Sequence, residues 1–424
     1  MEFEITRRIR SRLGSVSELD YYFLFFIWPF LGLLIAFQYF RCKWAKNLIW
    51  LYTIYFGFTF VIPNNEVDAS RYRDALIMMR DTNFSLEILF SSYFSADSGM
   101  LDIAQRLLTF IISRFTDDYR FLFAAFGLFL GYFLSRMIWL LIEKTSDKLD
   151  LLDSLILISF SLVVGIWDIG GFRFSVATLV FVYGVLQYLL NSNKGGLFIS
   201  ISTIFIHWSF GLALAVLFIY LLVKNKLLIY FGIFVLSYLI SELNLDAVRN
   251  IFSRYAPLAV TESRGSYLNE YYIQGLADRS GSIAWYISGH VQALRWYVFG
   301  FAVYYYLWGI QKIREDKQLV SLFSFSLLFY GIFNSLSSIP SMMRFIEVGN
   351  LFMLAFLFSN IVYIKNKMPI ILKFVGIPVL LLFIAVRMRM GLDYIGMLAI
   401  IGSPLYIYFT ENSVALIDMV KGNL

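Results

Sequence analysis

The chain has 424 residues, of which 59% are hydrophobic and only 15% are charged. A soluble protein of this length could not cover its surface with so few charges, so the composition excludes a soluble globular protein. The net charge of +6 is typical of membrane-flanking basic residues and does not indicate a nucleic-acid partner. One cysteine, Cys42, and two histidines leave no internal disulfide and no transition-metal site, and no cofactor is expected.

Long apolar runs recur along the whole chain and predict an all-α, polytopic integral membrane protein, because a bilayer core of about 30 Å needs roughly 20 helical residues. The polar/apolar alternation of a membrane β-barrel is absent. We expect about 11 transmembrane helices, at residues 21–40, 47–62, 120–142, 150–166, 172–190, 227–243, 293–311, 319–337, 345–364, 369–386 and 393–409. Residues 1–20 form an N-terminal extension to a single transmembrane domain, 21–424, with outer loops at 63–119 and 244–292.

The lysines predict the orientation. All 13, from Lys43 to Lys421, can be placed on one side of the membrane, which the positive-inside rule makes cytoplasmic. The opposite loops contain arginines but no lysine, and the planar guanidinium suits phosphate and carboxylate groups. Four arginines between Arg7 and Arg12 favour a cytoplasmic N-terminus, whereas the number of downstream spans places it outside. Its orientation therefore stays open.

Residues 197–222 are too few for two full crossings, although Lys194 and Lys224 flank them on the same predicted side. A single tilted helix of this length would extend roughly 39 Å and move Lys224 to the outside. We prefer a re-entrant hairpin with its tip near His207, because non-helical backbone at membrane depth is tolerated where it lines a protein cavity.

The first ionisable group in chain order follows the second span and contains Asp68, Arg71 and Tyr72. Asp68 and Arg71 are three residues apart, so a surface ion pair on one helical face is the simple interpretation. The functional interpretation is a contact with an acceptor sugar or a pyrophosphate at the mouth of a cavity.

The second group runs from Trp167 to Arg173 and contains paired glycines between two spans. Arg173 opens the following helix, where free N–H groups and the helix dipole favour an anion. Asp168 is a candidate base in the same turn. The alternative is a tight turn with a snorkelling arginine. Arg173 is the strongest single candidate in the chain.

His207, in an otherwise apolar segment, and Arg344, at the outer start of a predicted span, are two further candidate residues. A neutral His207 can act as a base or bind phosphate, or it can simply bond a neighbouring helix. Arg344 repeats the helix-entrance pattern of Arg173, although it can also contact lipid phosphate at the interface.

The long loop 244–292 combines Arg264, Arg279 and His290 with many tyrosines. Loops of this length often bind ligands or act as lids, and aromatic rings can stack on sugars. An aromatic belt at the membrane interface is the alternative.

Taken together and in this order, these motifs resemble the EpsG-like branch of the Wzy-type polysaccharide polymerases. The resemblance is carried by Asp68, Arg71 and Tyr72, by Arg173 with Ala177, by the inner turn 191–196, by His207 with Ser209, and by Arg344. It implies a GT-C-like glycosyltransferase in the bacterial cytoplasmic (inner) membrane, with its active site facing the periplasm or exterior. Such an enzyme moves a growing glycan from undecaprenyl pyrophosphate onto a new lipid-linked repeat unit.

The resemblance also implies roles for these residues. Arginines can stabilise the pyrophosphate leaving group without a metal ion. The expected catalytic residues are Arg173, His207, Asp68 and Asp168, and the expected substrate-binding residues are Arg71, Tyr72, Arg264, Arg279, His290 and Arg344. The expected partners are the lipid-linked glycan donor and acceptor and the membrane lipids, and a chain-length regulator stays open.

Two other classes also stay open, a polysaccharide flippase or transporter and an O-antigen ligase-like or acyl transferase. An acyltransferase usually has a histidine–acid pair within one motif, and neither His207 nor His290 has an acid within four residues.

Overall fold

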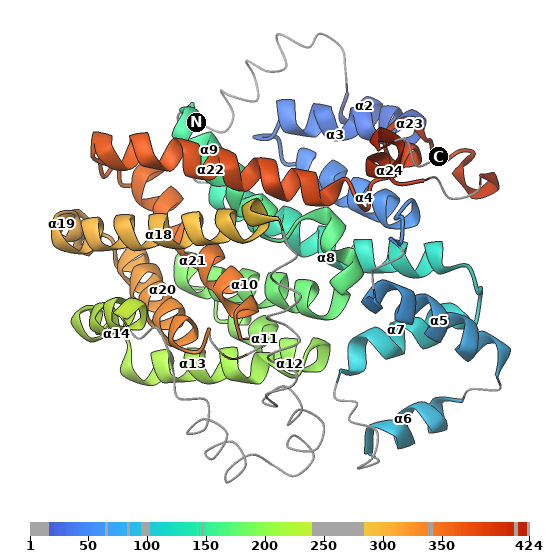
Figure 1. Cartoon of the computed structure of the whole chain (residues 1–424), viewed down its shortest axis with the longest axis horizontal. Helices are drawn as coiled ribbons and strands as arrows, with labels where there is room; N and C mark the ends of the chain where they lie inside the picture. Colours follow the sequence, from blue (N-terminus) through green and yellow to red (C-terminus); the bar gives the residue numbers. More distant parts are fainter. Residues whose placement is uncertain are drawn as a thin grey trace.

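The computed structural model describes residues 17–63, 67–82, 85–94, 102–143, 145, 148–239, 284–337, 339, 342–410 and 414–421, and every regular element in these ranges is a helix (Figure 1). Five stretches are long and apolar enough to cross a membrane: Tyr119–Ile142, Leu151–Asn191, Lys317–Ser335, Arg344–Val362 and Ile370–Gly391. An all-α membrane fold is therefore confirmed. The number of about 11 crossings is not confirmed, and two of the predicted spans are corrected below. The GT-C-like architecture stays a prediction.

The helices differ widely in length. In chain order they are α2 (Glu18–Ile27), α3 (Pro29–Gln38), α4 (Ala45–Phe58), α5 (Val67–Asp81), α6 (Leu86–Phe94), α7 (Ile103–Ser113), α8 (Tyr119–Ile142), α9 (Leu151–Val163), η2 (Ile166–Gly171), α10 (Phe172–Asn191), α11 (Gly195–Ile201), α12 (Thr203–Ile206), α13 (Phe210–Val223), α14 (Leu227–Leu239), α18 (Trp285–Leu307), α19 (Ile310–Glu315), α20 (Lys317–Ser335), α21 (Arg344–Val362), α22 (Ile370–Gly391), α23 (Met397–Ile401), η4 (Ile407–Phe409) and α24 (Leu416–Val420). The apolar stretch Leu151–Asn191 thus contains two helices, α9 and α10, joined by the turn η2.

The core is built from antiparallel helices packed through aromatic rings. Phe333 of α20 stacks on Phe345 of α21 at 4.5 Å, and Phe323 stacks on Phe356 at 4.2 Å towards their other ends. The bundle therefore has two opposite ends. We call the end with Lys148, Lys194, Lys224, Lys317 and Lys365 the lysine end, and the end with Arg173, Arg344 and Arg387 the arginine end.

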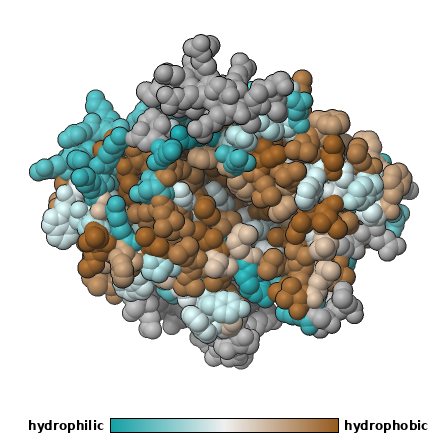
Figure 2. All heavy atoms as spheres, turned by 90° about the horizontal axis from the view of Figure 1, so that it is seen from above, coloured by the Kyte–Doolittle hydropathy of each residue, from teal (hydrophilic) through white to brown (hydrophobic). Residues whose placement is uncertain are grey.

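The surface has an apolar middle. Figure 2 shows hydrophobic residues over the middle of one face and hydrophilic residues gathered at its left edge. Figure 1, which shares the horizontal axis, places α19 of the lysine end on the same side. On α22, Ile370 and Phe374 are 85% and 78% exposed, as expected for side chains that face lipid.

The predicted span 21–40 is wrong, because these residues form two helices of ten residues each. Pro29 opens α3, where its fixed φ and missing N–H are tolerated, and the chain turns back at Trp28. Tyr21 stacks on Trp44 at 4.5 Å and lies 5.9 Å from Tyr39, so α2 and α3 are antiparallel. Each helix is about 15 Å long, roughly half of a bilayer core.

This hairpin removes the conflict over the N-terminus. Glu18 and Lys43 now flank the α2–α3 hairpin on the same side, because the chain returns to the end from which it started. The number of predicted crossings falls by one. It therefore now places the N-terminus on the same side of the membrane as the arginines between Arg7 and Arg12 do. Those arginines themselves lie outside the described residues.

The predicted span 393–409 is also wrong. Gly396 and Gly402 bound α23, which has only five residues, and Pro404 follows. The segment folds onto α4, where the Tyr55 hydroxyl donates to the Leu398 carbonyl at 2.7 Å. The Leu416 N–H then donates to the Ile395 carbonyl at 2.8 Å.

Lys421 follows this segment and therefore lies at the arginine end. The placement of all lysines on one side is wrong at this position. The predicted outer loop 63–119 is also not a plain loop, because it contains the helices α5, α6 and α7.

Residues 195–223 form a helical hairpin with His207 at its tip. The α11–α12 leg runs back along α10, with the Ser200 hydroxyl 3.4 Å from the Phe181 carbonyl. The α13 leg returns to the lysine end, where the Tyr220 hydroxyl donates to the Ser321 carbonyl at 3.3 Å. The reversal near His207 agrees with the predicted hairpin, and its re-entry into a membrane stays a prediction.

Topology can be tested by cysteine labelling in a Cys42→Ser background. With a membrane-impermeant maleimide on spheroplasts, we expect Lys421→Cys to be labelled and Ser17→Cys to be protected, because they lie at opposite ends of the fold. Phe115→Cys at the arginine end and Lys194→Cys at the lysine end are the matched positive and negative controls. Labelling of Ser17→Cys from outside would contradict the hairpin assignment of α2 and α3.

Close backbone packing of α4 on α8 can be tested with glycine variants. A Cβ on Gly127 would lie 2.3 Å from the Thr53 carbonyl oxygen, whereas a Cβ on Gly232 meets no atom within 4 Å. Gly127→Ala should therefore lower the free energy of unfolding by about 1–3 kcal/mol, because the helices must separate. Gly232→Ala should be neutral or slightly stabilising. Thermal unfolding in detergent measures both, and equal melting temperatures would refute the close contact.

Candidate active site

A cavity of about 260 Å³ opens at the arginine end of the bundle. It lies where α5, the start of α10, the tip of the α12–α13 hairpin and the start of α21 meet. The lining residues are Asp68, Tyr72, Gly171, Arg173, Phe174, Ser175, His207, Arg344 and Glu347. Five of the predicted site residues, Asp68, Tyr72, Arg173, His207 and Arg344, thus line one cavity although they are far apart in sequence.

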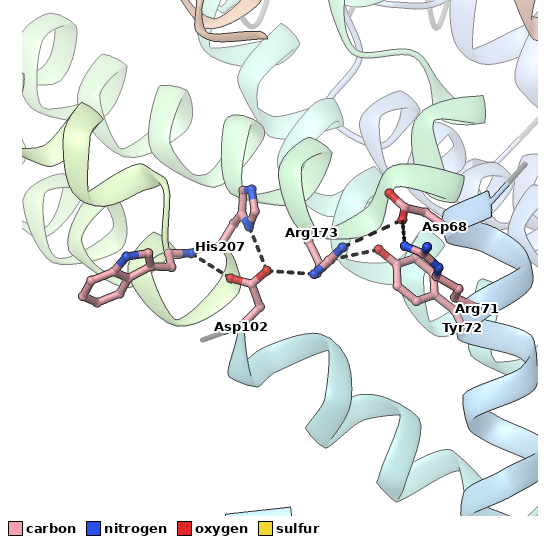
Figure 3. Close-up of polar contacts among 7 residues, drawn as sticks. Asp68, Arg71, Tyr72, Asp102, Arg173 and His207 are labelled. Atoms are coloured by element: carbon pink, nitrogen blue, oxygen red, sulfur yellow. Dashed lines mark hydrogen bonds and ion pairs between the residues drawn. The ribbon is translucent and has the colours of Figure 1, made fainter. Parts of the chain in front are cut away.

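Arg173 is held by contacts from other segments (Figure 3). Its Nη1 lies 3.1 Å from Asp102 Oδ2, its Nε donates to the Tyr72 hydroxyl at 3.1 Å, and its Nη2 lies 3.9 Å from Asp68 Oδ1. The glycine-containing turn η2 directly precedes Arg173 and places it in the first turn of α10. The guanidinium is therefore already engaged by the protein.

Asp102 joins Arg173 to the hairpin tip (Figure 3). It precedes α7 and is only 6% exposed. Its Oδ2 lies 2.9 Å from Nδ1 of His207, and its Oδ1 accepts the Trp208 N–H at 2.8 Å. Burial alone would raise the pKa of Asp102, but the bonds to His207 and Trp208 and the charge of Arg173 hold it below its usual value. Asp102 is therefore ionised at neutral pH.

An ionised Asp102 determines which nitrogen of His207 is available. In the neutral imidazole the carboxylate favours a hydrogen on Nδ1, which leaves the lone pair on Nε2. Since His207 lines the cavity, Nε2 is the site at which it can accept a proton. This histidine–carboxylate arrangement is typical of general bases.

Tyr72 and Asp68 complete this side of the cavity. Burial raises the pKa of Tyr72 to about 12, so its phenol stays protonated and serves as a hydrogen-bonding group. Asp68 also lies 3.8 Å from Arg71, whose side chain is 73% exposed. The simple interpretation of a surface ion pair thus holds for Arg71, while Asp68 takes part in both contacts.

Arg344 differs from Arg173 in its surroundings. It begins α21 and is exposed, and its guanidinium lies 5.9 Å from the ring of Phe174. Among the described residues, no carboxylate lies within ion-pair distance of it. Arg344 is therefore the lining arginine that can receive an external anion.

Asp168 lies in η2, is not among the lining residues, and is held in structural contacts. Its carboxylate pairs with Arg387 and accepts the Gly165 N–H at 2.7 Å. Arg387 also donates to the Leu162 carbonyl at 2.8 Å and the Val163 carbonyl at 3.0 Å. These bonds attach α22 to the end of α9 and hold the turn that presents Arg173. A catalytic role for Asp168 stays a prediction.

Three predicted site residues remain: His290, Arg264 and Arg279. His290 is buried in α18, where its Nδ1 lies 3.0 Å from the Tyr286 carbonyl, and it does not line the cavity. Arg264 and Arg279 lie outside the described residues. Within the described part of the chain, no group of three or more His, Cys, Asp or Glu side chains is placed to hold a metal ion.

The sequence analysis missed Asp102, Glu347 and Arg387. Asp102 is 105 residues from His207, so a search for nearby acids could not find the pair. Arg387 carried a usable signal, because an arginine near the end of an apolar helix is costly and usually functional or paired. Glu347 carried a weaker signal of the same kind.

Comparison with known proteins gives one match. No curated protein and no solved structure matches the chain. The model of the EpsG family matches residues 81–399, about three quarters of the chain. The match includes Asp102, Arg173, His207 and Arg344 and begins after the segment with Asp68 and Tyr72. The chain therefore belongs to the EpsG family, as its motifs predicted, and is a multi-pass membrane protein of polysaccharide biosynthesis.

Proposed function

We propose that this protein polymerises undecaprenyl-pyrophosphate-linked repeat units into a surface polysaccharide at the outer face of the bacterial cytoplasmic membrane, by glycosyl transfer that needs no metal ion. The observation that carries the proposal is that His207, which is paired with Asp102, lines one cavity with Arg344, for which the described residues include no ion-pair partner. The pair supplies a base for an acceptor hydroxyl, and the arginine supplies a positive charge for a phosphate.

The reaction uses both groups in one step. The acceptor hydroxyl attacks the anomeric carbon of the donor sugar as the bond from that carbon to the pyrophosphate oxygen breaks. His207 Nε2 takes the hydroxyl proton, and Asp102 stabilises the imidazolium that forms. The pyrophosphate leaves with the bonding electron pair, and Arg344 stabilises its charge.

The two arginines have different roles in this proposal. Arg173 already donates hydrogen bonds to Asp102 and Tyr72 and forms an ion pair with Asp68, so it acts mainly as a positioning residue for Asp102. Arg344 keeps its N–H groups available to bind the pyrophosphate of the lipid-linked glycan donor. Asp68 and Arg71, at the mouth of the cavity, contact the glycan. In this proposal Asp168 positions η2 through Arg387, and His207 acts as the base.

The histidine–carboxylate pair favours bond chemistry over transport. A flippase needs to bind and release a lipid-linked glycan, but it has no need of an oriented base. A ligase-like transferase would use the same base and the same arginine with a different acceptor. The products formed from a lipid-linked repeat separate these cases: longer glycan on the lipid indicates polymerisation, transfer to another lipid indicates ligation, and an unchanged substrate indicates transport.

The base can be tested with His207→Ala and Asp102→Asn in purified protein supplied with a lipid-linked repeat unit. We expect His207→Ala to lower the turnover rate by about 10²–10⁴-fold, because the substitution removes the group that takes the proton. Asp102→Asn should also lower it, because the neutral amide no longer favours the required tautomer. Asp118→Asn is the matched control, since Asp118 also pairs with an arginine, Arg120, but lies outside the cavity. Wild-type rates in His207→Ala would rule out the proposed base.

The division of roles between the arginines predicts different defects. Arg344→Ala should weaken binding of undecaprenyl pyrophosphate in nanodiscs by about 10–100-fold, the cost of losing a charge-assisted bond. Arg173→Ala should leave insertion intact and change this affinity little, while turnover falls and polymer collapses to single repeats. Long polymer made by Arg173→Ala, or unchanged affinity in Arg344→Ala, would contradict the assignment.

A further inference from the structure

Glu347 is the cavity-lining acid to which the proposed reaction assigns no role. It lies in the first turn of α21, three residues after Arg344, so both side chains project from one face of the helix. Among the residues that the structure describes, Glu347 has no direct hydrogen-bond or ion-pair partner, and its electrostatic neighbours are Arg387, Asp168 and Arg344. Glu347 is only partly buried and lines the cavity, so its carboxyl oxygens can accept hydrogen bonds from a ligand.

Arg387 does not supply that partner. Its donors reach Asp168 and the carbonyls of Leu162 and Val163, which fixes the guanidinium behind the cavity wall. Glu347 therefore interacts with Arg387 through charge and not through a direct bond. Its carboxyl oxygens remain available on the side of the cavity.

The position of Glu347 relative to Arg344 restricts which part of a ligand its carboxyl group can bind. Residues three apart on a helix have Cβ atoms about 5–6 Å apart, and both side chains line one cavity, so a group bound by Glu347 lies close to the phosphate bound by Arg344. In a polyprenyl-pyrophosphate-linked glycan that group is the second phosphate, the polyprenyl chain or the first sugar. A carboxylate repels phosphate, and an apolar chain cannot satisfy its oxygens. Sugar hydroxyls can, because they donate hydrogen bonds to a carboxyl group in either protonation state.

We propose that Glu347 binds the hydroxyls of the sugar that carries the pyrophosphate, and that it makes the cavity prefer the glycosylated carrier over the bare carrier lipid. This inference rests on the proposed function. It also accounts for product release. Once the glycan has moved to the acceptor, the ionised form of Glu347 faces a pyrophosphate with no sugar and repels it.

The test compares two kinds of probe in nanodiscs: undecaprenyl pyrophosphate alone, and undecaprenyl pyrophosphate that bears one glucose, galactose or N-acetylglucosamine. We expect the wild-type protein to bind at least one sugar-bearing lipid more tightly than the bare lipid. Glu347→Ala should reduce this preference by at least about tenfold, the cost of losing bonds to a charged group, while binding of the bare lipid stays equal or becomes tighter. Glu347→Gln keeps the shape and part of the hydrogen bonding, so it should retain an intermediate preference.

Glu315→Gln is the matched charge control, because Glu315 is exposed on α19 at the lysine end. Equal weakening of all lipids in Glu347→Ala would show a structural role in charge balance and overturn the inference, and so would a wild-type protein with no preference for any sugar-bearing lipid. Failure of the wild-type protein to bind even the bare lipid would instead refute the proposed function. The two failures are therefore distinguishable.

Discussion

The buried Asp102 carboxylate is the contact on which the candidate site depends. A carboxylate that is 6% exposed is costly unless its oxygens are paired, and here Arg173, His207 and the Trp208 N–H supply the partners. These groups come from the start of α10 and from the hairpin tip, while Asp102 precedes α7. The same bonds that orient the base also satisfy the non-helical backbone at the tip. Loss of Asp102 would therefore disturb both the geometry of the base and the anchoring of the hairpin.

Close helix packing sets the position of the hairpin tip. A Cβ on Gly196 would lie 2.3 Å from the Gly184 carbonyl oxygen, so α11 contacts α10 backbone to backbone at this point. From there α11 and α12 extend along α10 and bring His207 level with Arg173 at the arginine end. Small residues allow such contacts between helices in membranes, where packing replaces the hydrophobic effect. The distances within the candidate site at one end of the bundle thus depend on glycines nearer the other end.

The sequence predicted the parts of this molecule that depend on local composition. Apolar runs indicated most helices, and rare ionisable residues in those runs indicated Arg173, His207 and Arg344. Hydropathy measures the length of an apolar run but not its direction, so the reversal before Pro29 and the break at Gly402 were missed even though proline and glycine signalled them. Asp102 could not be paired with His207 from sequence, because that contact exists only after α7, α10 and the hairpin meet.

The charge of the cavity differs from that of a simple anion site. Arg173 is balanced by Asp102 and Asp68, whereas Arg344 stands one turn from Glu347 without bonding it. Among the described lining residues, the proposed pyrophosphate therefore meets the exposed Arg344, the protonated phenol of Tyr72 and the carboxyl groups of Asp68 and Glu347, and not a uniformly positive wall. In the proposed mechanism, such a site holds a phosphate more firmly when the attached group offers hydrogen-bond donors to Glu347. This requirement suits a polymerase, whose donor and spent carrier share the same pyrophosphate and must still be told apart.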